Sequence, residues 1–405
     1  MSTLRHDPST RWLRATRGSL LAIALALLAF AAGAADAPGT TRDAAQATSD
    51  AAEAKPDSAE AKPDAADAKP NPTQAKADAA QAKSDAAAAP ASATDGKPEA
   101  PTVDAERLFS AIVKVSVRAV ADARSNATLG REREGSGVVI GDDGLVLTIG
   151  YLIVEADDVN VTDAHGRTVP AQVVGYDHNS GFGLVRTMLP IDAAPVRFGD
   201  SARIAEKDPV LIASAGDERA AFAYIVSKRA FTGNWEYQLD SAIYTSPPTL
   251  NWSGAALIDR DGKLIGIGSL IVREATDGDP KIPGNVFVPI DLLKPILTDL
   301  VREGHRTGPA RPWLGVSADE IQGRVLVTRV SPEGPADLAG LQPGDIILAV
   351  GGDVVRSQSE FYQRLWTRGR AGDEIPLKVL QGTDVRDVKV RSIDRLQYFR
   401  PKSTI

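Results

Sequence analysis

One serine is the residue of this chain best suited to covalent chemistry. Ser253 stands in the stretch Asn251-Trp252-Ser253-Gly254-Ala255-Ala256. A serine hydroxyl is a poor nucleophile until a neighbouring base, most often an imidazole oriented by a carboxylate, removes its proton. The chemistry that this serine could support is therefore acyl transfer, including peptide-bond hydrolysis, provided that the fold brings a base to it.

Candidate bases are scarce, because the chain has only four histidines. His178 is the most interesting of them, since it follows Asp177 and could form a rearranged set with Asp177 and Ser253 if its loop moved toward the serine. The alternative interpretation is a histidine on a surface turn. The other three lie in an N-terminal leader, a predicted hairpin turn and a segment after a predicted helix: His6, His165 and His305.

Composition excludes several other chemistries. The 405 residues include no cysteine, which rules out disulfides, thiol catalysis and thiolate metal sites. No group of His, Asp and Glu has the spacing of metal ligands, so we expect neither a metal nor a cofactor. The formal net charge of -7 argues against a nucleic-acid backbone as partner.

Short strands must carry the Ser253 loop. Val113, Val115 and Val117 alternate with polar residues, which is typical of a half-buried strand. Further apolar runs separated by turn-forming Asp-Gly and His-Gly pairs predict strands near 137–140, 145–148, 159–162 and 169–174. Many short strands at regular spacing predict a barrel or a sandwich. An apolar stripe over 292–301 predicts a helix that closes this region.

A third unit begins near Arg311. Strands are predicted over 325–330 and 345–350, and Ser357-Gln358-Ser359-Glu360 has the pattern of a capping box at the start of a helix. Phe361 and Leu365 are spaced to share one face of that helix. The combination predicts a small α+β domain over 311–396, followed by a C-terminal tail, 397–405.

The N-terminal quarter of the chain has the composition of a targeting segment and a linker. Four arginines precede an uncharged apolar run from Ser19 to Ala32, which is followed by small residues. This pattern predicts a secretory signal peptide over 1–34, with an uncleaved membrane anchor as the alternative. Residues 35–103 consist almost entirely of Ala and Pro together with the polar residues Lys, Asp, Ser, Glu and Gln, so we expect a disordered linker. Export to the periplasm or cell envelope follows.

Several motifs in order resemble one protease family. Gly135-Ser136-Gly137-Val138-Val139-Ile140, with Asp143-Gly144 and Leu147-Thr148 behind it, is similar to the HtrA (Deg/Do) family, and the similarity continues through 253–267 and 286–300. The resemblance implies a mainly β protein. Its chymotrypsin/trypsin-like domain of two barrels would span 104–306 and precede a PDZ domain over 311–396.

The same resemblance implies that the catalytic groups are degenerate. Tyr151 occupies the family's histidine position and Gly181 its aspartate position, whereas Ser253 stands at the nucleophile position. The oxyanion-hole positions are Asn251 and Ser253, and the family has glycine where Asn251 stands. A phenol with a pKa near 10 is a base in only about one molecule in a thousand at neutral pH.

The PDZ motif looks intact by the same comparison. Arg311-Pro312-Trp313-Leu314-Gly315-Val316 matches the family's carboxylate-binding loop, so Trp313, Leu314, Gly315 and Val316 are the predicted peptide-binding residues. Backbone N–H groups of such a loop bind the carboxylate at a peptide's C-terminus, and the peptide adds as a strand to the neighbouring sheet edge. The alternative is a PDZ domain used only for packing within the chain.

These expectations combine into one leading hypothesis and two alternatives. The leading hypothesis is a pseudoprotease that binds peptides or the C-termini of unfolded proteins in the cell envelope. The alternatives are an active serine endopeptidase with a rearranged base and a structural scaffold. The resemblance also implies a homo-oligomer, commonly a trimer. Regulation of an active protease paralogue is one role open to the leading hypothesis.

Overall fold

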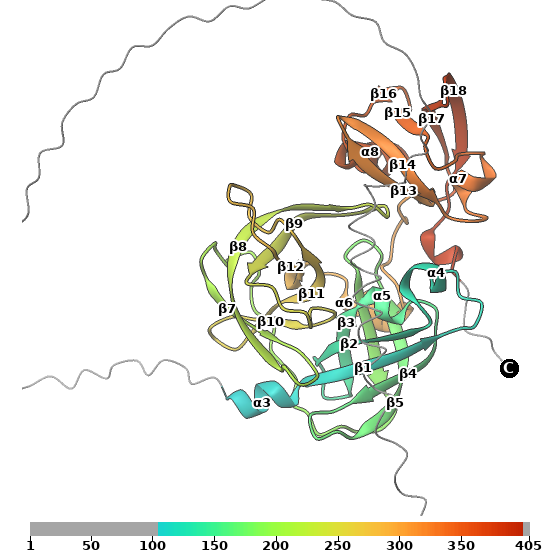
Figure 1. Ribbon diagram of the computed structural model, residues 1–405. Helices are drawn as coiled ribbons and strands as arrows, with labels where there is room; N and C mark the ends of the chain where they lie inside the picture. The colour runs from blue at the N-terminus through green and yellow to red at the C-terminus, as the bar shows by residue number, and fades with distance from the viewer. Residues whose placement is uncertain (1–103, 400–405) are drawn as a thin grey trace, which may run out of the picture. The chain divides into compact units, whose positions relative to one another are not determined.

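The computed structural model describes residues 104–399. The predicted signal segment, 1–34, and the predicted linker, 35–103, lie outside the described residues. Three β units follow one another along the described chain (Figure 1).

The first unit is a closed six-stranded barrel with the strand order β1-β2-β3-β6-β5-β4. A short helix, α3 (Ala105–Ser110), precedes it, and α4 (Asn126–Leu129) and α5 (Gly150–Ile153) interrupt it. Antiparallel pairing of β1 with both β2 and β4 closes the barrel. Its strands are β1 (Ile112–Ala119), β2 (Glu132–Val139), β3 (Leu145–Ile149), β4 (Ala156–Thr162), β5 (Thr168–Tyr176) and β6 (Phe182–Thr187).

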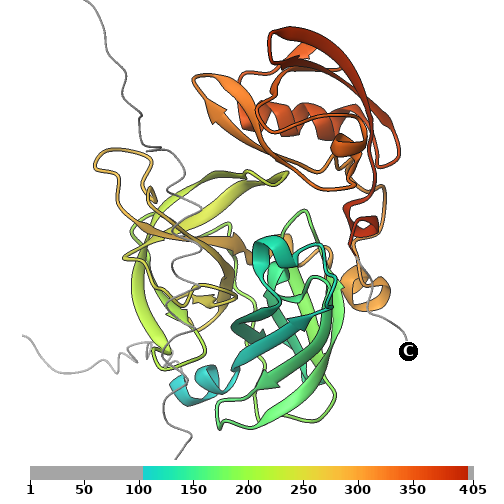
Figure 2. The same ribbon diagram turned by 45° about the vertical axis from the view of Figure 1, so that its right-hand side comes forward.

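A second closed barrel follows, with the order β10-β11-β12-β9-β8-β7. Its longest strands, β8 and β9, form a hairpin that extends past the rest of the barrel in both ribbon views (Figures 1 and 2). The strands are β7 (Pro209–Ala213), β8 (Ala220–Gly233), β9 (Tyr237–Ser246), β10 (Ala256–Ile258), β11 (Leu264–Val272) and β12 (Gly284–Pro289).

The third unit is an antiparallel sheet with the order β13-β14-β15-β17-β18, in which β16 pairs with β15. Helix α8 (Gln358–Arg368) lies against this sheet (Figure 2). Its Phe361, Tyr362 and Leu365 are buried in the core of the unit. Its other elements are β13 (Val316–Ile321), β14 (Arg324–Val330), α7 (Pro335–Leu338), β15 (Ile346–Val350), β16 (Asp353–Val354), β17 (Glu374–Gln381), β18 (Asp384–Arg391) and η2 (Arg395–Gln397).

The alternating residues predicted to face inward do so. Val113, Val115 and Val117 are at most 3% exposed and belong to a cluster of buried residues that includes side chains of both barrels. Burial of such side chains contributes about 1.5–3 kcal/mol each relative to leaving them in water. Burial of residues that alternate with polar ones in the sequence therefore stabilises the barrels.

The helix predicted over 292–301 is interrupted. A 3₁₀ turn, η1 (Ile290–Leu292), and a shorter helix, α6 (Leu297–Glu303), take its place, although Leu293 and Leu300 are buried as the stripe requires. Pro295 lies between the two elements and has no N–H to donate, so the helical hydrogen-bond ladder cannot run through it.

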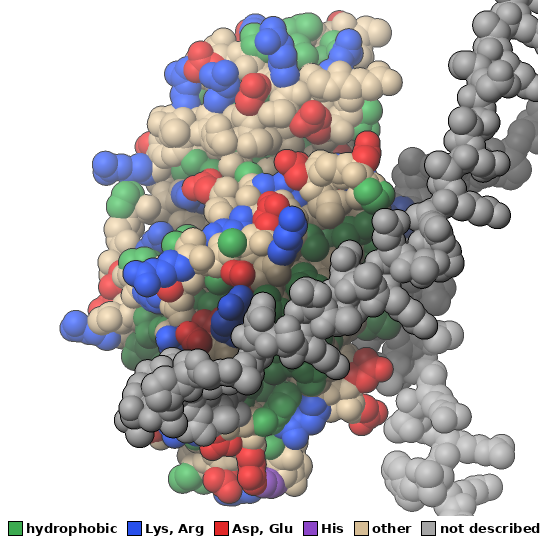
Figure 3. Space-filling view, turned by 90° about the vertical axis from the view of Figure 1, so that its left-hand side faces the viewer, with side chains coloured by type: hydrophobic (Ala, Val, Ile, Leu, Met, Phe, Trp, Pro, Cys, Tyr) green, Lys and Arg blue, Asp and Glu red, His purple; other side chains and the backbone are tan. Residues whose placement is uncertain are grey.

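The surface carries charges of both signs. On the face shown in Figure 3, Lys and Arg side chains are interspersed with Asp and Glu. Among residues 104–399, no helix has the length and apolar character needed to cross a bilayer.

The capping motif at α8 gives a stability prediction. The Ser357 side chain accepts a hydrogen bond from the Glu360 N–H at 3.1 Å, and the Glu360 carboxylate accepts one from the Arg356 N–H at 2.9 Å. Ser357→Ala should destabilise the protein by about 1 kcal/mol, because one N–H of the first turn loses its partner. Urea unfolding should show a lower midpoint with an unchanged slope, whereas Ser359→Ala should shift it less.

Candidate functional site

The Ser253 hydroxyl lies against a phenol. Its Oγ is 2.9 Å from the Tyr151 hydroxyl, which is also 3.1 Å from the Ser269 carbonyl oxygen. Tyr151 comes from α5, directly after β3, and Ser253 from the loop before β10. The structure thus brings together the residues that the sequence analysis placed at the nucleophile and histidine positions.

The surroundings of Tyr151 make its phenol a poor proton acceptor. Burial raises the pKa of Tyr151 to about 12, although hydrogen bonds with Ser253 and Trp252 act in the opposite direction. At neutral pH the phenol is protonated and can donate its single hydrogen, either to Ser253 Oγ or to the Ser269 carbonyl. It can therefore hold the serine hydroxyl in place by a hydrogen bond.

A tyrosine lies beside the predicted aspartate position. Gly181 adopts a left-handed backbone conformation with a φ of +83°, and its carbonyl accepts a hydrogen bond from the Gly150 N–H at 2.6 Å. A Cβ at this position would lie 3.2 Å from the Tyr237 hydroxyl, which donates to the Ser180 carbonyl at 2.6 Å. A carboxylate-bearing side chain at Gly181 would be both strained and crowded.

The predicted oxyanion-hole position at Asn251 has an internal partner. The Asn251 N–H donates to Thr249 Oγ1 at 3.2 Å, and the Asn251 side chain reaches the Glu218 carbonyl at 3.4 Å. Buried Asn285 fixes this segment, because its amide group both accepts from the Thr249 N–H and donates to the Thr249 carbonyl. An oxyanion would have to compete with Thr249 for this donor.

The structure does not bring the Asp177-His178 pair to Ser253. The Asp177 carboxylate accepts from Ser180 and from the Arg306 guanidinium, whose Nη2 lies 3.0 Å away. His178 packs edge-on to Tyr176 and stacks on Phe399, and burial lowers its pKa well below the usual value.

Two other histidines lie in different surroundings, and the fourth lies outside the described residues. His165 is 3.7 Å from the exposed Asp192 carboxylate, and His305 Nδ1 lies 3.0 Å from the Arg306 carbonyl. His6 belongs to the part that the structure does not describe. Within residues 104–399, no group of three or more His, Cys, Asp or Glu is arranged to hold a metal ion.

The predicted carboxylate-binding loop holds a carboxylate of the same chain. Glu236, at the tip of the β8–β9 hairpin, accepts backbone hydrogen bonds from three consecutive residues. Its Oε1 lies 2.7 Å from the Gly315 N–H nitrogen and 2.8 Å from that of Val316, and its Oε2 lies 3.0 Å from that of Leu314. Consecutive N–H groups that converge in this way form an anion-binding concavity.

Local conformation explains why these residues can meet. Gly315 has a φ of +81°, which turns its N–H toward the same point as its neighbours. Glu236 itself has a φ of +54°, a left-handed conformation that costs a non-glycine residue about 1–2 kcal/mol. The backbone hydrogen bonds that its side chain accepts from residues 314–316 hold it in this conformation.

Trp313 differs from the other three predicted peptide-binding residues in its contacts. Its N–H donates to the Ile393 carbonyl at 3.0 Å, and its ring packs on Tyr398. The N–H groups of Leu314, Gly315 and Val316 therefore contact the Glu236 carboxylate, whereas that of Trp313 pairs with Ile393.

The hairpin also contacts the edge of the third unit through its backbone. The Ala318 N–H on the edge strand β13 donates to the Asn234 carbonyl at 3.0 Å, and the Gln358 side chain donates to the Gly233 carbonyl at 3.3 Å. The Glu236 N–H donates to the Tyr362 hydroxyl at 3.1 Å. Residues 233–236, here called the hairpin tip, thus occupy both the anion site and part of the strand edge.

Comparisons with known proteins identify both units. Residues 135–267 match the model of a trypsin-like peptidase domain, and residues 312–391 match that of a PDZ domain. Curated relatives aligned over 66% and 71% of this chain are named Do-like HtrA and DegS. The chain therefore belongs to the HtrA family. Its fold is thereby confirmed as mainly β, with a trypsin-like domain of two barrels and a C-terminal PDZ domain.

Curated HtrA relatives are moderately similar. "Serine protease Do-like HtrA" from Lactobacillus helveticus is 29% identical over 66% of this chain and 70% of its own length. "Probable periplasmic serine protease do/HhoA-like" from Haemophilus influenzae is 29% identical, and the match covers 64% of this chain but only 57% of that protein. "Serine endoprotease DegS" from Escherichia coli is 26% identical over 71% of this chain and 84% of its own length.

Two residues important to this HtrA site escaped the sequence analysis. Glu236 fills the PDZ anion site and Tyr237 lies beside the aspartate position, yet both stand in an ordinary strand connection, Gly233-Asn234-Trp235-Glu236-Tyr237. The left-handed Glu236 is the only local anomaly in that stretch, and it is a property of the backbone. No sequence signal pairs residue 236 with residues 314–316.

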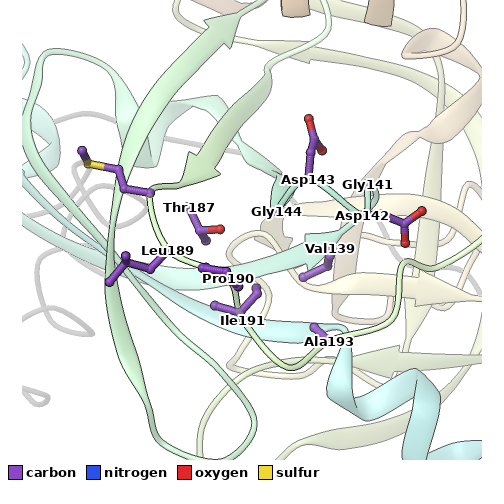
Figure 4. Close-up of a pocket in the computed structure, with 11 residues that line it drawn as sticks. Val139, Gly141, Asp142, Asp143, Gly144, Thr187, Leu189, Pro190, Ile191 and Ala193 are labelled. Atoms are coloured by element: carbon purple, nitrogen blue, oxygen red, sulfur yellow. The ribbon is translucent and has the colours of Figure 1, made fainter.

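A hollow elsewhere in the HtrA barrel is separate from Ser253. It has a volume of about 270 Å³ and is lined by the turn 141–144 and the segment 187–193 (Figure 4). No residue of the serine loop lines it. Its backbone-rich wall and the outward carboxylates of Asp142 and Asp143 do not form a convergent polar site.

Glu236 gives a pH prediction. Burial raises its pKa from 4.5 to about 7, against the three backbone N–H groups and the positive Arg395, which lower it. A carboxyl whose pKa is raised by folding stabilises the folded state fully below about pH 4.5, and this contribution is lost as the pH rises through about 7. The difference can reach about 3 kcal/mol.

The wild type should therefore lose stability relative to Glu236→Gln as the pH rises from about 5 to about 8. Urea unfolding at a series of pH values measures this difference. Glu303→Gln, which removes an equal charge from an exposed position, should track the wild type throughout. A difference between wild type and Glu236→Gln that stays constant with pH would contradict the prediction.

Proposed function

We propose that this HtrA homologue does not cleave peptide bonds and instead binds peptides or unfolded chains through its PDZ domain. The observation that carries the proposal is the Tyr151–Ser253 hydroxyl pair. In the described part of the chain, the Ser253 hydroxyl hydrogen-bonds to no imidazole and no carboxylate. The histidine and aspartate positions hold Tyr151 and Gly181, and the Asn251 N–H is already engaged.

The magnitudes favour inactivity. Removing the histidine of a serine-protease triad costs on the order of a millionfold in turnover. A phenol with a pKa near 12 is deprotonated in only about one molecule in 10⁵ at neutral pH. Good substrate binding alone would not offset losses in turnover of this size.

The PDZ domain supports the binding half of the proposal. Its loop already binds a carboxylate through three N–H groups. Its edge strand β13 already donates a backbone hydrogen bond to the Asn234 carbonyl. The C-terminus of a peptide presents the same two features, a carboxylate preceded by an extended backbone. The ligand class that fits is therefore a polypeptide C-terminus, as exposed by misfolded or cleaved proteins.

The cell envelope is the proposed location. The relative from Haemophilus influenzae is named as periplasmic, and the basic and apolar N-terminal segment of this chain fits export. Regulation of an active paralogue and homo-oligomer formation belong to the same proposal, since a non-cleaving member can share clients and interfaces with a cleaving one.

Inactivity can be tested directly. Purified protein should leave a casein substrate uncut and should resist a fluorophosphonate probe, because no group activates Ser253. Labelling should stay undetectable from about pH 6 to about pH 10, since Tyr151, with a pKa of about 12, remains almost fully protonated over this range. Gel-based probe labelling measures both effects.

Ser253→Ala is the matched variant, and an active HtrA-type protease is the positive control. The variant should be indistinguishable from the wild type in both assays. Labelling that the wild type shows and Ser253→Ala lacks would restore the view that the protein is an endopeptidase.

Peptide binding can be tested with one pair of ligands. A fluorescent peptide with an apolar last residue and a free α-carboxylate should bind the full chain, and the same peptide ending in a carboxamide should bind at least about tenfold more weakly. Fluorescence anisotropy measures both. Equal affinity for acid and amide would show that the loop does not recognise the C-terminus.

A further inference from the structure

We infer that Glu236 is an internal ligand of the PDZ domain, so that a peptide C-terminus binds only by displacing the hairpin tip from the anion site. The inference rests on the proposed peptide-binding function and adds a built-in competitor to it. Its basis is that one carboxylate already uses the three N–H groups that a peptide carboxylate requires.

The hairpin tip resembles a bound peptide in more than its carboxylate. The Asn234 carbonyl accepts from the Ala318 N–H on the free edge of β13, where an added peptide strand would pair. The Gly233 carbonyl accepts from Gln358 at the start of α8. Anion and backbone contacts therefore come from one short segment, and an incoming peptide would need the same donors.

Burial makes simultaneous occupation impossible. Glu236 is 6% exposed, while Leu314 and Val316 are 0% and 2% exposed. A second carboxylate cannot approach these N–H groups while the Glu236 carboxylate remains, because the anion site is closed to solvent and two carboxylates would repel each other. Occupation by a peptide and occupation by Glu236 exclude each other.

The hairpin tip can also leave the anion site without disturbing the rest of the hairpin. Glu236 holds a left-handed backbone that its side-chain contacts must maintain, so loss of those contacts removes the reason for that conformation. The release is local, because the neighbouring Tyr237 has its own hydrogen bond to the Ser180 carbonyl inside the barrel domain. The hairpin can therefore give up the anion site while its base stays in place.

Substitution at Glu236 should strengthen peptide binding. A carboxamide at this position offers one oxygen to Gly315 and Val316 but turns its NH₂ toward the Leu314 N–H, so Glu236→Gln should weaken the internal ligand with little change of shape. Glu236→Ala removes it altogether. Because apparent affinity scales with the open fraction, both variants should bind the free-acid peptide at least about tenfold more tightly than the wild type.

The experiment measures anisotropy of the free-acid and amide peptides with the full chain in four forms: wild type, Glu236→Gln, Glu236→Ala and Glu303→Gln. Tighter acid binding by both Glu236 variants, with Glu303→Gln at the wild-type level, is the expected result. Equal acid binding by all four forms would overturn the internal-ligand inference and leave peptide binding standing. Absence of acid-selective binding in every form would overturn both.

Hydrogen exchange of the wild type gives an independent readout that does not depend on a variant. Adding the free-acid peptide should speed exchange of the Glu236 N–H, which loses the Tyr362 hydroxyl as acceptor when the tip leaves. The amide peptide should not have this effect. Unchanged protection of residue 236 under saturating free-acid peptide would contradict displacement.

Discussion

Two hydroxyl groups facing each other determine what the barrel domain can do. A serine acts as a nucleophile when its partner can take a proton, and the partner here is a buried phenol that keeps its own. The rest of the site is consistent with this pairing: Gly181 offers no carboxylate, and Asn251 has given its N–H to Thr249. The fold of a protease thus surrounds a serine whose hydroxyl pairs with a phenol and with no imidazole among the described residues.

The same hairpin serves both halves of the protein. Glu236 reaches the anion site of the PDZ domain, and the next residue, Tyr237, packs beside Gly181 at the barrel site. One strand connection therefore contributes to the surroundings of the predicted aspartate position and to the anion site of the PDZ domain.

Sequence patterns and the family resemblance together predicted the architecture. Alternating valines and Asp-Gly turns predicted the strands of a barrel or a sandwich, and the resemblance to the HtrA family implied two barrels and a PDZ domain. The predicted carboxylate-binding loop includes Leu314, Gly315 and Val316, whose N–H groups contact Glu236. What the sequence could not show was non-local. Glu236 and Leu314 are far apart along the chain, and neither residue type nor spacing indicates that they meet. Pro295 was visible in the sequence, yet the apolar stripe around it predicted an unbroken helix.

The left-handed backbone at Gly181 has a consequence for evolution. A histidine at position 151 alone would gain no carboxylate to orient it, and a carboxylate at position 181 would meet backbone strain and the Tyr237 ring. Under the proposed function, a return to hydrolysis would therefore require changes at residues 151 and 181 together with space made at Tyr237, and no single one of these changes would be enough.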